Sequence, residues 1–282
     1  MRHALVFGGS GQIGRAVLAR LHAAGWSVTA VSRAPQPACP GVRWLQGGFP
    51  SPPPLPADVD AVLSCGPLDA FAAWFARSGQ REVRVVAFGS TSVEVKGDSP
   101  DAQERDVARR LREAEARLFD ATPAATVLRP TLVYGAGRDA TLTRIAHLAR
   151  RYRAFPLPRG ARGLRQPVHV DDLADAALAC LDVPAAHGRA YALPGGETLP
   201  YREMVVRVLA TLSPPPRLVE LPVPLFALLF AAARASGRAH GFGDAALARL
   251  RTDLVFDAAP ARRDFGYAPR AFRPDALTFG LG

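Results

Sequence analysis

The stretch that most constrains the fold is "LVFGGSGQIGRAVLARL", residues 5–21. An apolar run typical of a buried strand leads into a glycine-rich turn, and a helical pattern follows the turn. Gly8, Gly11 and Gly14 fit the spacing GxxGxxG, and Gly9, Gly11 and Gly14 fit GxGxxG. Glycine permits the tight turn and lets backbone N–H groups approach a bound phosphate. The pattern therefore predicts a strand, a turn and a helix built around an anionic ligand.

The order of these elements makes a dinucleotide the expected ligand. A glycine motif of this kind is weak alone, but it gains weight where it follows a predicted strand and opens a helix. The helix that starts near residue 12 directs the positive end of its dipole at the phosphates. A merely structural turn is the alternative. The residues predicted to contact the cofactor here are Gly8, Gly11, Gln12, Ile13 and Gly14.

The rest of the chain repeats the alternation of short strands and helices, which predicts a parallel sheet with crossover helices. The expected strands are residues 3–8, 27–32, 42–46, 61–65, 83–89 and 125–130. The expected helices are residues 12–24, 68–78, 101–120 and 171–182. The fold class is therefore α/β, a Rossmann-type doubly wound parallel sheet with a small C-terminal substrate or cap domain.

A change of pattern near residue 196 suggests where that second domain begins. Helices, prolines and short loops follow it, so we expect a dinucleotide-binding domain over 1–195 and a small helical region over 196–282. The proline-rich stretch 50–56 is expected to be a surface connection, because the α/β alternation resumes after it. The apolar stretch 224–237 is too short for the roughly 20 residues that a membrane span needs. A cap or lid helix is favoured there over a membrane-surface helix.

Composition excludes several classes of protein. Apolar residues make up 49% of the 282 residues and charged residues 21%, as in globular proteins. The net charge of +10 could indicate nucleic acid, but arginine is scattered along the chain and no basic strand carries stacking aromatics. We expect no nucleic acid and no membrane span. The three cysteines have no metal-binding or disulfide spacing, and the amino-terminal residues do not resemble a secretory signal. No metal and a cytoplasmic location are therefore expected.

The end of the second strand bears on the choice of cofactor. An acidic residue there would bind the ribose 2′-hydroxyl of NAD and repel the 2′-phosphate of NADP. This chain instead has Ser32, 18 residues after Gly14, and then Arg33. Both side chains can hydrogen-bond a phosphate. The sequence therefore favours NADP(H), with NAD(H) as the alternative, unless Arg33 is an ordinary exposed arginine.

Three segments together carry a family resemblance: the opening glycines, "LRPTLVYGAGRD" (128–139) and "QPVHVDDLADA" (166–176). In this order and spacing, they resemble the extended short-chain dehydrogenase/reductases, in particular the NAD-dependent epimerase/dehydratase family. The resemblance covers about the first 195 residues. It implies that Cys65 and Gly66 run past the cofactor and that Arg129 and Pro130 lie near the nicotinamide. It also implies that the segment from His169 leads into a helix beneath the site, although Asp171 and Asp172 could simply cap that helix.

The chain departs from this family at the catalytic dyad. The family uses a Ser or Thr together with Tyr and Lys in YxxxK, where the Lys lowers the pKa of the Tyr. Ser92 matches the hydroxyl, but the Tyr and Lys positions hold Val107 and Leu111. These two begin an apolar stripe that Ala114 and Leu118 continue. The family also often has an Asp that holds adenine where this chain has Gly48. The resemblance is thus to atypical members that keep the fold without the dyad.

Two classes of function remain open. The first is an oxidoreductase-type enzyme on a small carbonyl or sugar-type substrate, with Ser92, Tyr134 and His169 as candidate catalytic residues. Arginines of the segment 159–165 could bind an anionic substrate, or could belong to a solvated loop. The second is a catalytically inactive NADPH-binding sensor, regulatory or structural protein. The sequence leaves open whether the chain is a monomer or a homodimer.

Overall fold

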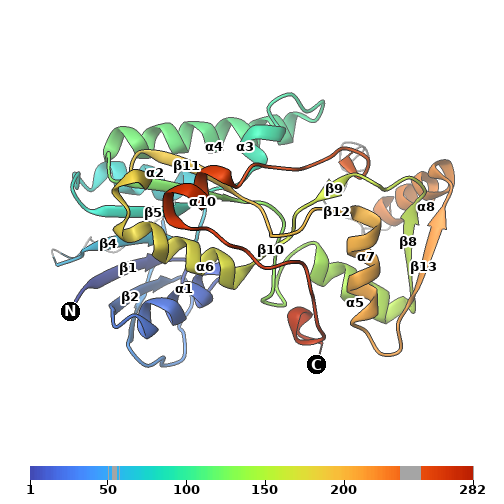
Figure 1. The fold of residues 1–282 in the computed structure, drawn as a ribbon, viewed down its shortest axis with the longest axis horizontal. Coiled ribbons are helices and arrows are strands. Elements are labelled where there is room, and N and C mark those ends of the chain that lie inside the picture. The colour runs from blue at the N-terminus through green and yellow to red at the C-terminus, as the bar shows by residue number, and fades with distance from the viewer. Residues whose placement is uncertain (50, 53–55, 57, 236–248, 282) are drawn as a thin grey trace. The chain divides into compact units, whose positions relative to one another are not determined.

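The computed structural model describes residues 1–49, 51–52, 56, 58–235 and 249–281 (Figure 1). The chain forms two compact units that are interleaved in sequence. Unit 1 comprises residues 1–131, 168–194 and 256–269, and unit 2 comprises residues 132–167, 195–255 and 270–282. The expected domain boundary after residue 195 stays a prediction. One of the points where the chain passes between units, Pro194 to Gly195, lies beside it.

Unit 1 contains a seven-stranded parallel sheet, as the strand pattern predicts, in the order β11-β6-β5-β4-β1-β2-β3. Its strands are β1 (His3–Phe7), β2 (Ser27–Ser32), β3 (Val42–Gln46), β4 (Ala61–Ser64), β5 (Arg84–Phe88), β6 (Ala125–Pro130) and β11 (Arg189–Leu193). The first six agree with the sequence-based ranges to within one residue at each end. Strand β1 pairs with both β2 and β4, so the strand order reverses beside it. In open α/β sheets, ligands bind outside the carboxyl ends of the strands at such a switch point.

Helices cover both faces of this sheet, as the Rossmann-type prediction requires (Figure 1). Helix α1 packs against α6, and α2 packs against α4. The helices of unit 1 are α1 (Gln12–Ala23), α2 (Leu68–Arg77), α3 (Ser92–Val95), α4 (Ala102–Ala121), α6 (Val170–Ala179) and α10 (Ala259–Phe265). The expected helix over 171–182 ends at Ala179, and a short 3₁₀ turn, Cys180–Asp182, continues it.

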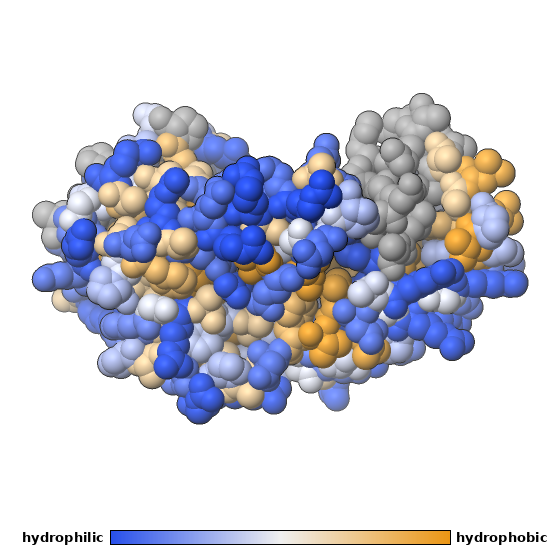
Figure 2. Space-filling model, turned by 90° about the horizontal axis from the view of Figure 1, so that it is seen from above, coloured by the Kyte–Doolittle hydropathy of each residue, from blue (hydrophilic) through white to orange (hydrophobic). Residues whose placement is uncertain are grey.

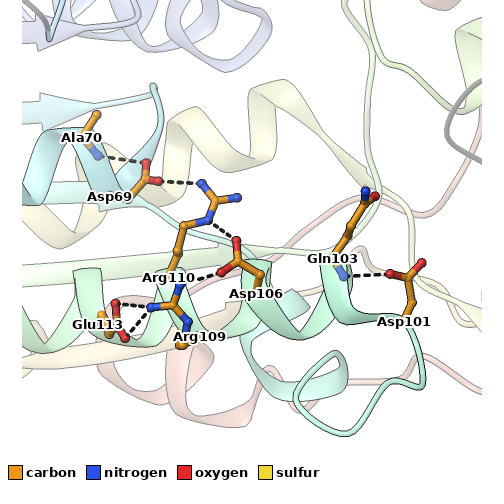
Figure 3. A network of polar contacts seen from close by, with 8 residues as sticks. All are labelled: Asp69, Ala70, Asp101, Gln103, Asp106, Arg109, Arg110 and Glu113. Carbon is orange, nitrogen blue, oxygen red and sulfur yellow. Dashed lines mark hydrogen bonds and ion pairs between the residues drawn. The ribbon is translucent and has the colours of Figure 1, made fainter.

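The exposed surface of α4 carries charges of both signs (Figure 3). Asp101 caps the helix by accepting a hydrogen bond from the Gln103 N–H. Farther along, Asp106 pairs with Arg109 and Arg110, and Arg110 also reaches Asp69 of α2 at 2.9 Å. These side chains are solvent-exposed, so the network contributes modestly to stability.

Unit 2 is built around a separate apolar core. Its elements are β7 (Val133–Tyr134), α5 (Leu142–Tyr152), β8 (Ala154–Pro158), β9 (Leu164–Arg165), β12 (Leu199–Pro200), α7 (Tyr201–Ala210), β13 (Arg217–Leu221) and α8 (Val223–Ala235). Helices α5 and α7 pack together, and β8 pairs with β13. Buried Asp139 accepts backbone hydrogen bonds from the first turn of α5 and so fixes where that helix begins.

Two further expectations concern surface segments. Residues 50 and 53–55 of the proline-rich connection lie outside the described part of the chain. Helix α8 overlaps the apolar stretch 224–237 and starts one residue before it, at Val223. Among the described residues, none of the helices is both long and apolar enough to cross a membrane.

Candidate functional site

The glycine turn between β1 and α1 lies at the carboxyl edge of the sheet, where its backbone is packed too closely for side chains. Gly8 has φ +72°, and a Cβ there would come 2.8 Å from the Cys65 carbonyl carbon. A Cβ on Gly14 would come 2.1 Å from the Gly8 oxygen. These two glycines are therefore needed to bring β1, β4 and α1 together, independently of any ligand.

Gly11 differs from its two neighbours in the motif. Its φ of −75° suits any residue, and a Cβ there would meet only the Gly8 oxygen, at 3.1 Å. Gly11 is the N-cap of α1, and it brings no side chain to accept hydrogen bonds from the first turn. Within the described residues, the N–H groups of Gln12 and Ile13 have no acceptor. An anion placed at this turn would satisfy them.

Two buried polar atoms near the same edge also have no hydrogen-bond partner in the described part of the chain. They are Gln12 Oε1, at the start of α1, and Ser64 Oγ, at the end of β4. Buried polar groups in proteins are usually satisfied, so unmet ones at a sheet edge indicate a missing partner. The free amides and these orphaned atoms fit a polar ligand with phosphate groups at the β1–α1 turn.

The end of β2 forms a small polar cluster that the sequence identified only in part. Buried Ser32 donates a hydrogen bond to Ser10 Oγ at 3.2 Å, and Gln36 donates to Ser32 Oγ at 3.3 Å. Arg33 is exposed, and its guanidinium has no protein partner among the described residues. The structure thus places Ser32 at the end of β2, the strand adjoining β1, and Arg33 directly after it. Ser10 and Gln36 were missed, although Ser10 lies within the glycine motif.

The segment after β4 passes close to the first turn. Gly66 faces the Phe49 ring, and Phe49 stacks on Phe7 with ring centroids 5.1 Å apart. Burial raises the pKa of the Cys65 thiol to about 12, so this cysteine is neutral at pH 7. Phe49 follows Gly48, the residue that the sequence resemblance aligns with an adenine-binding Asp.

The hydroxyl-rich segment after β5 presents one uncommitted side chain. Thr91 donates to the Pro130 carbonyl oxygen at 3.2 Å, and Ser90 Oγ accepts from the Ser92 N–H at 3.1 Å. Ser92 is partly exposed, and its Oγ has no partner within the described chain. Of these three hydroxyls, the one that matches the family's catalytic serine is thus the one free to contact a ligand.

Arg129, predicted to lie near the nicotinamide, is held by two carboxylates. Its Nε donates to Glu115 Oε1 at 2.8 Å, its Nη2 contacts Glu115 Oε2, and its Nη1 donates to Glu94 Oε1 at 2.9 Å. Burial alone would lower the pKa of Arg129, but the bonds to Glu115 and Glu94 outweigh it and raise that pKa. Pro130 lies beside Arg129 at the end of β6. A cofactor contact by either residue stays a prediction.

The apolar stripe expected on α4 packs against the core of unit 1: Ala114 and Leu118 are buried, and partly buried Leu111 packs against the same cluster. Val107 is partly buried. Glu115, one turn after Leu111, is 5% exposed and lies beside this stripe. The local sequence pattern did not predict that Glu115 is buried, because its partner Arg129 lies on a different element, β6. No Tyr or Lys occupies the dyad positions of α4.

The two remaining catalytic candidates have structural roles. His169 is the N-cap of α6, and its Nδ1 accepts a hydrogen bond from the Asp171 N–H at 3.2 Å. The cap is therefore the histidine, and not Asp171 or Asp172 as the capping alternative supposed. Tyr134 belongs to unit 2, is 1% exposed and packs edge-on against Phe272. Their catalytic roles stay predictions.

The three arginines of the segment 159–165 in unit 2 differ in how exposed they are. Arg159 and Arg162 are exposed, whereas Arg165 is buried and donates to the carbonyl oxygens of Leu164 and Thr252. Burial lowers the pKa of Arg165. Arg165 thus holds its own loop together, and only the two exposed arginines are free of such a structural task. Among the described residues, no cluster could hold a metal ion.

Comparison with known proteins agrees with this architecture. Residues 4–50, which include the glycine turn, match the model of the NAD dependent epimerase/dehydratase family. UDP-glucose 4-epimerase of Vibrio cholerae is 27% identical over 180 residues, covering 62% of this chain and 52% of that protein. The 2-alkyl-3-oxoalkanoate reductase of Stenotrophomonas maltophilia is 28% identical over 180 residues, covering 58% and 53%. The chain spans about half the length of these curated relatives.

Solved structures share the fold over nearly the whole chain. MoeE5 in complex with UDP-glucose and NAD superposes with a TM-score of 0.67 at 18% identity, covering 98% of this chain and 96% of that one. The parallel sheet, its strand order and the glycine turn define a Rossmann-type protein. The resemblance expected from the sequence is confirmed: residues 4–50 match the NAD dependent epimerase/dehydratase family, and the chain as a whole is similar to proteins of this kind.

A substitution at Gly11 separates a ligand-binding turn from a structural one. We expect Gly11→Val to fold, because its φ is ordinary, and to lower dinucleotide affinity at least about tenfold by filling the space before the free amides. Circular dichroism checks the fold, and fluorescence titration with NADPH measures the affinity. Ala23→Val, at the exposed far end of α1, is the control. Unchanged affinity in a folded Gly11→Val variant would contradict a phosphate site at this turn.

Proposed function

We propose that unit 1 binds NADP(H), with its pyrophosphate at the turn from Gly8 to Gly14. The observation that carries this proposal is the open first turn of α1, whose amide N–H groups at Gln12 and Ile13 lack acceptors in the described structure. A helix N-terminus stabilises an anion through these groups and through its dipole. The NAD bound to the structural relative MoeE5 supports the same assignment.

The preference for NADP(H) over NAD(H) rests on the end of β2. No carboxylate stands there to repel a 2′-phosphate, since the position holds Ser32, and exposed Arg33 offers a planar set of donors beside it. Ser10, Ser32 and Gln36 add hydroxyl and amide groups at the same place. NAD(H) remains the weaker ligand in this proposal.

The proposed activity is an oxidoreductase-type reaction on a small carbonyl or sugar-type substrate, which could be anionic. The nicotinamide would supply the hydride chemistry when bound. Ser92 is assigned to hydrogen-bond the substrate oxygen, because its hydroxyl is partly exposed and uncommitted in the described structure. Arg129 is assigned to support the end of β6, since Glu115 and Glu94 already engage its guanidinium. The relatives named as an epimerase and as a reductase of an oxo compound support this class.

The missing dyad favours a second candidate, a protein that binds NADPH without turnover. Val107 and Leu111 cannot donate or accept a proton, and the buried pair of Glu115 with Arg129 is committed to the fold. Such a protein would act as a sensor or structural partner. In either case the location is proposed to be the cytoplasm.

A turnover assay distinguishes the two candidates. NADPH oxidation is followed by absorbance with a panel of aldehydes, ketones and nucleotide sugars. For an enzyme, we expect Ser92→Ala to lower turnover about 100-fold with NADPH affinity unchanged, while Ser92→Thr keeps the hydroxyl and much of the rate. Tight NADPH binding with no turnover of any compound would favour the sensor. Full activity in Ser92→Ala would contradict the role given to Ser92.

A further inference from the structure

Helix α8 of unit 2 exposes three leucine side chains to solvent. Leu225, Leu228 and Leu229 are 50%, 68% and 48% exposed, whereas Phe226 is 9% exposed. Positions three and four apart share one face of a helix, so the three leucines form a continuous strip. Figure 2 shows hydrophobic atoms in orange gathered at the right-hand edge, with hydrophilic atoms beside them.

This arrangement is the reverse of an ordinary surface helix. Such a helix buries an apolar stripe and turns charged residues to water. The sequence of α8, VPLFALLFAAARA, contains no acidic residue, and Val223 at its start is also 39% exposed. Clustered exposed leucines mark a surface that binds an apolar partner.

The net positive charge of the protein comes from unit 2, the unit that carries this helix. By sequence, unit 2 has 17 arginines and 7 acidic residues, a net charge of +10, whereas unit 1 has 18 basic and 18 acidic residues. Two copies of unit 2 would therefore repel each other, and an anionic surface would attract it. This asymmetry favours an anionic partner over a second copy of the chain.

Part of this charge lies next to the start of α8. Arg159 is exposed, and its backbone N–H donates to the Leu221 oxygen at 2.8 Å, two residues before α8 begins. A Cβ on Gly160 would lie 3.9 Å from Arg251 Nε, and Arg162 and Arg251 are exposed as well. We call Arg159, Arg162 and Arg251 the arginine turn. It places positive charge near the start of α8.

We propose that α8 and the arginine turn dock the protein onto an anionic lipid surface. A helix of 13 residues spans about 20 Å, less than the roughly 30 Å of a hydrocarbon core, so α8 would lie in the interface and not cross it. The leucine face would enter the boundary between headgroups and acyl chains, while the arginines contact lipid phosphates. This use of unit 2 is independent of the cofactor site proposed in unit 1.

Vesicle co-sedimentation of the full chain tests the proposal. We expect binding to vesicles of phosphatidylcholine with one quarter phosphatidylserine, weak binding to phosphatidylcholine alone, and loss of binding at high salt. Leu225→Gln with Leu228→Gln should lower the partition coefficient at least about tenfold. Arg159→Gln should lower it about fivefold. Leu277→Gln, which changes a 78% exposed leucine elsewhere in unit 2, is the matched control and should have no effect.

Circular dichroism establishes that each variant is folded, and the single Leu228→Gln change provides a milder variant. The proposal is overturned if anionic vesicles do not bind the protein, or if the leucine variants bind as the wild type does. Sedimentation velocity tests whether a second copy of the chain covers α8 instead of a lipid surface. A wild-type dimer that Leu228→Gln converts to a monomer would show that α8 binds a second copy.

Discussion

Replacing Glu115 by alanine is expected to lower the free energy of unfolding by about 2 to 4 kcal/mol. The change leaves the Arg129 guanidinium, whose side chain is 21% exposed, with only the partly exposed Glu94 as its ion-pair partner. Breaking a buried pair by removing one member is costly because the other charge stays desolvated. The expected fall in the thermal unfolding midpoint is about 5 to 15 °C.

Glu113 provides the matched control, two residues away on α4. Its exposed side chain pairs with Arg109 at 2.9 Å, so Glu113→Ala should change the free energy of unfolding by less than about 0.5 kcal/mol. Glu115→Gln keeps an acceptor for Arg129, so its loss of unfolding free energy should lie between those of Glu115→Ala and Glu113→Ala. Thermal unfolding followed by circular dichroism measures all three. Equal midpoints for Glu115→Ala and Glu113→Ala would show that the pair does not stabilise unit 1.

Replacing Arg33 by alanine is expected to remove most of a preference for NADPH over NADH. A charge-assisted hydrogen bond contributes about 1.5 to 3 kcal/mol, which corresponds to a preference of roughly 10-fold to 150-fold. Affinity for NADH should hardly change, because NADH has no phosphate at that position. Titration of both cofactors into both proteins at fixed salt measures the effect.

Arg43→Ala is the control for Arg33→Ala. Arg43 is exposed on β3, the neighbour of β2, and its loss removes the same charge from the same region. It should leave the preference nearly intact. If Arg33→Ala lowers the affinity for NADH as much as the affinity for NADPH, Arg33 stacks on the adenine and does not bind the 2′-phosphate.

The sequence predicted the parts of the fold that depend on local pattern. Strands β1 to β6 are short apolar runs bounded by turn residues, and the glycine turn has a fixed spacing, so both can be read from neighbouring residues. Strand β11 was not predicted. Its residues, Arg189–Leu193, join the sheet beside β6 after a long connection, and their pattern alone does not specify that pairing.

The site was less predictable, because its contacts join residues far apart in the chain. The Glu115–Arg129 pair links α4 to β6, and nothing near Glu115 in sequence distinguishes it from the exposed acids of that helix. His169 capping α6 was likewise unexpected, since Asp171 and Asp172 are the commoner capping residues. Tyr134 lies in the core of unit 2, a placement that only tertiary packing determines.

The most direct test of the central claim is a fluorescence titration of the wild-type protein with NADPH and with NADH. The account predicts saturable binding of one dinucleotide per chain, with NADPH favoured roughly 10-fold to 150-fold. Because Arg33 would hold the 2′-phosphate that only NADPH carries, that preference should shrink as salt is raised. Absence of binding by either dinucleotide, or equal affinity for the two, would contradict it.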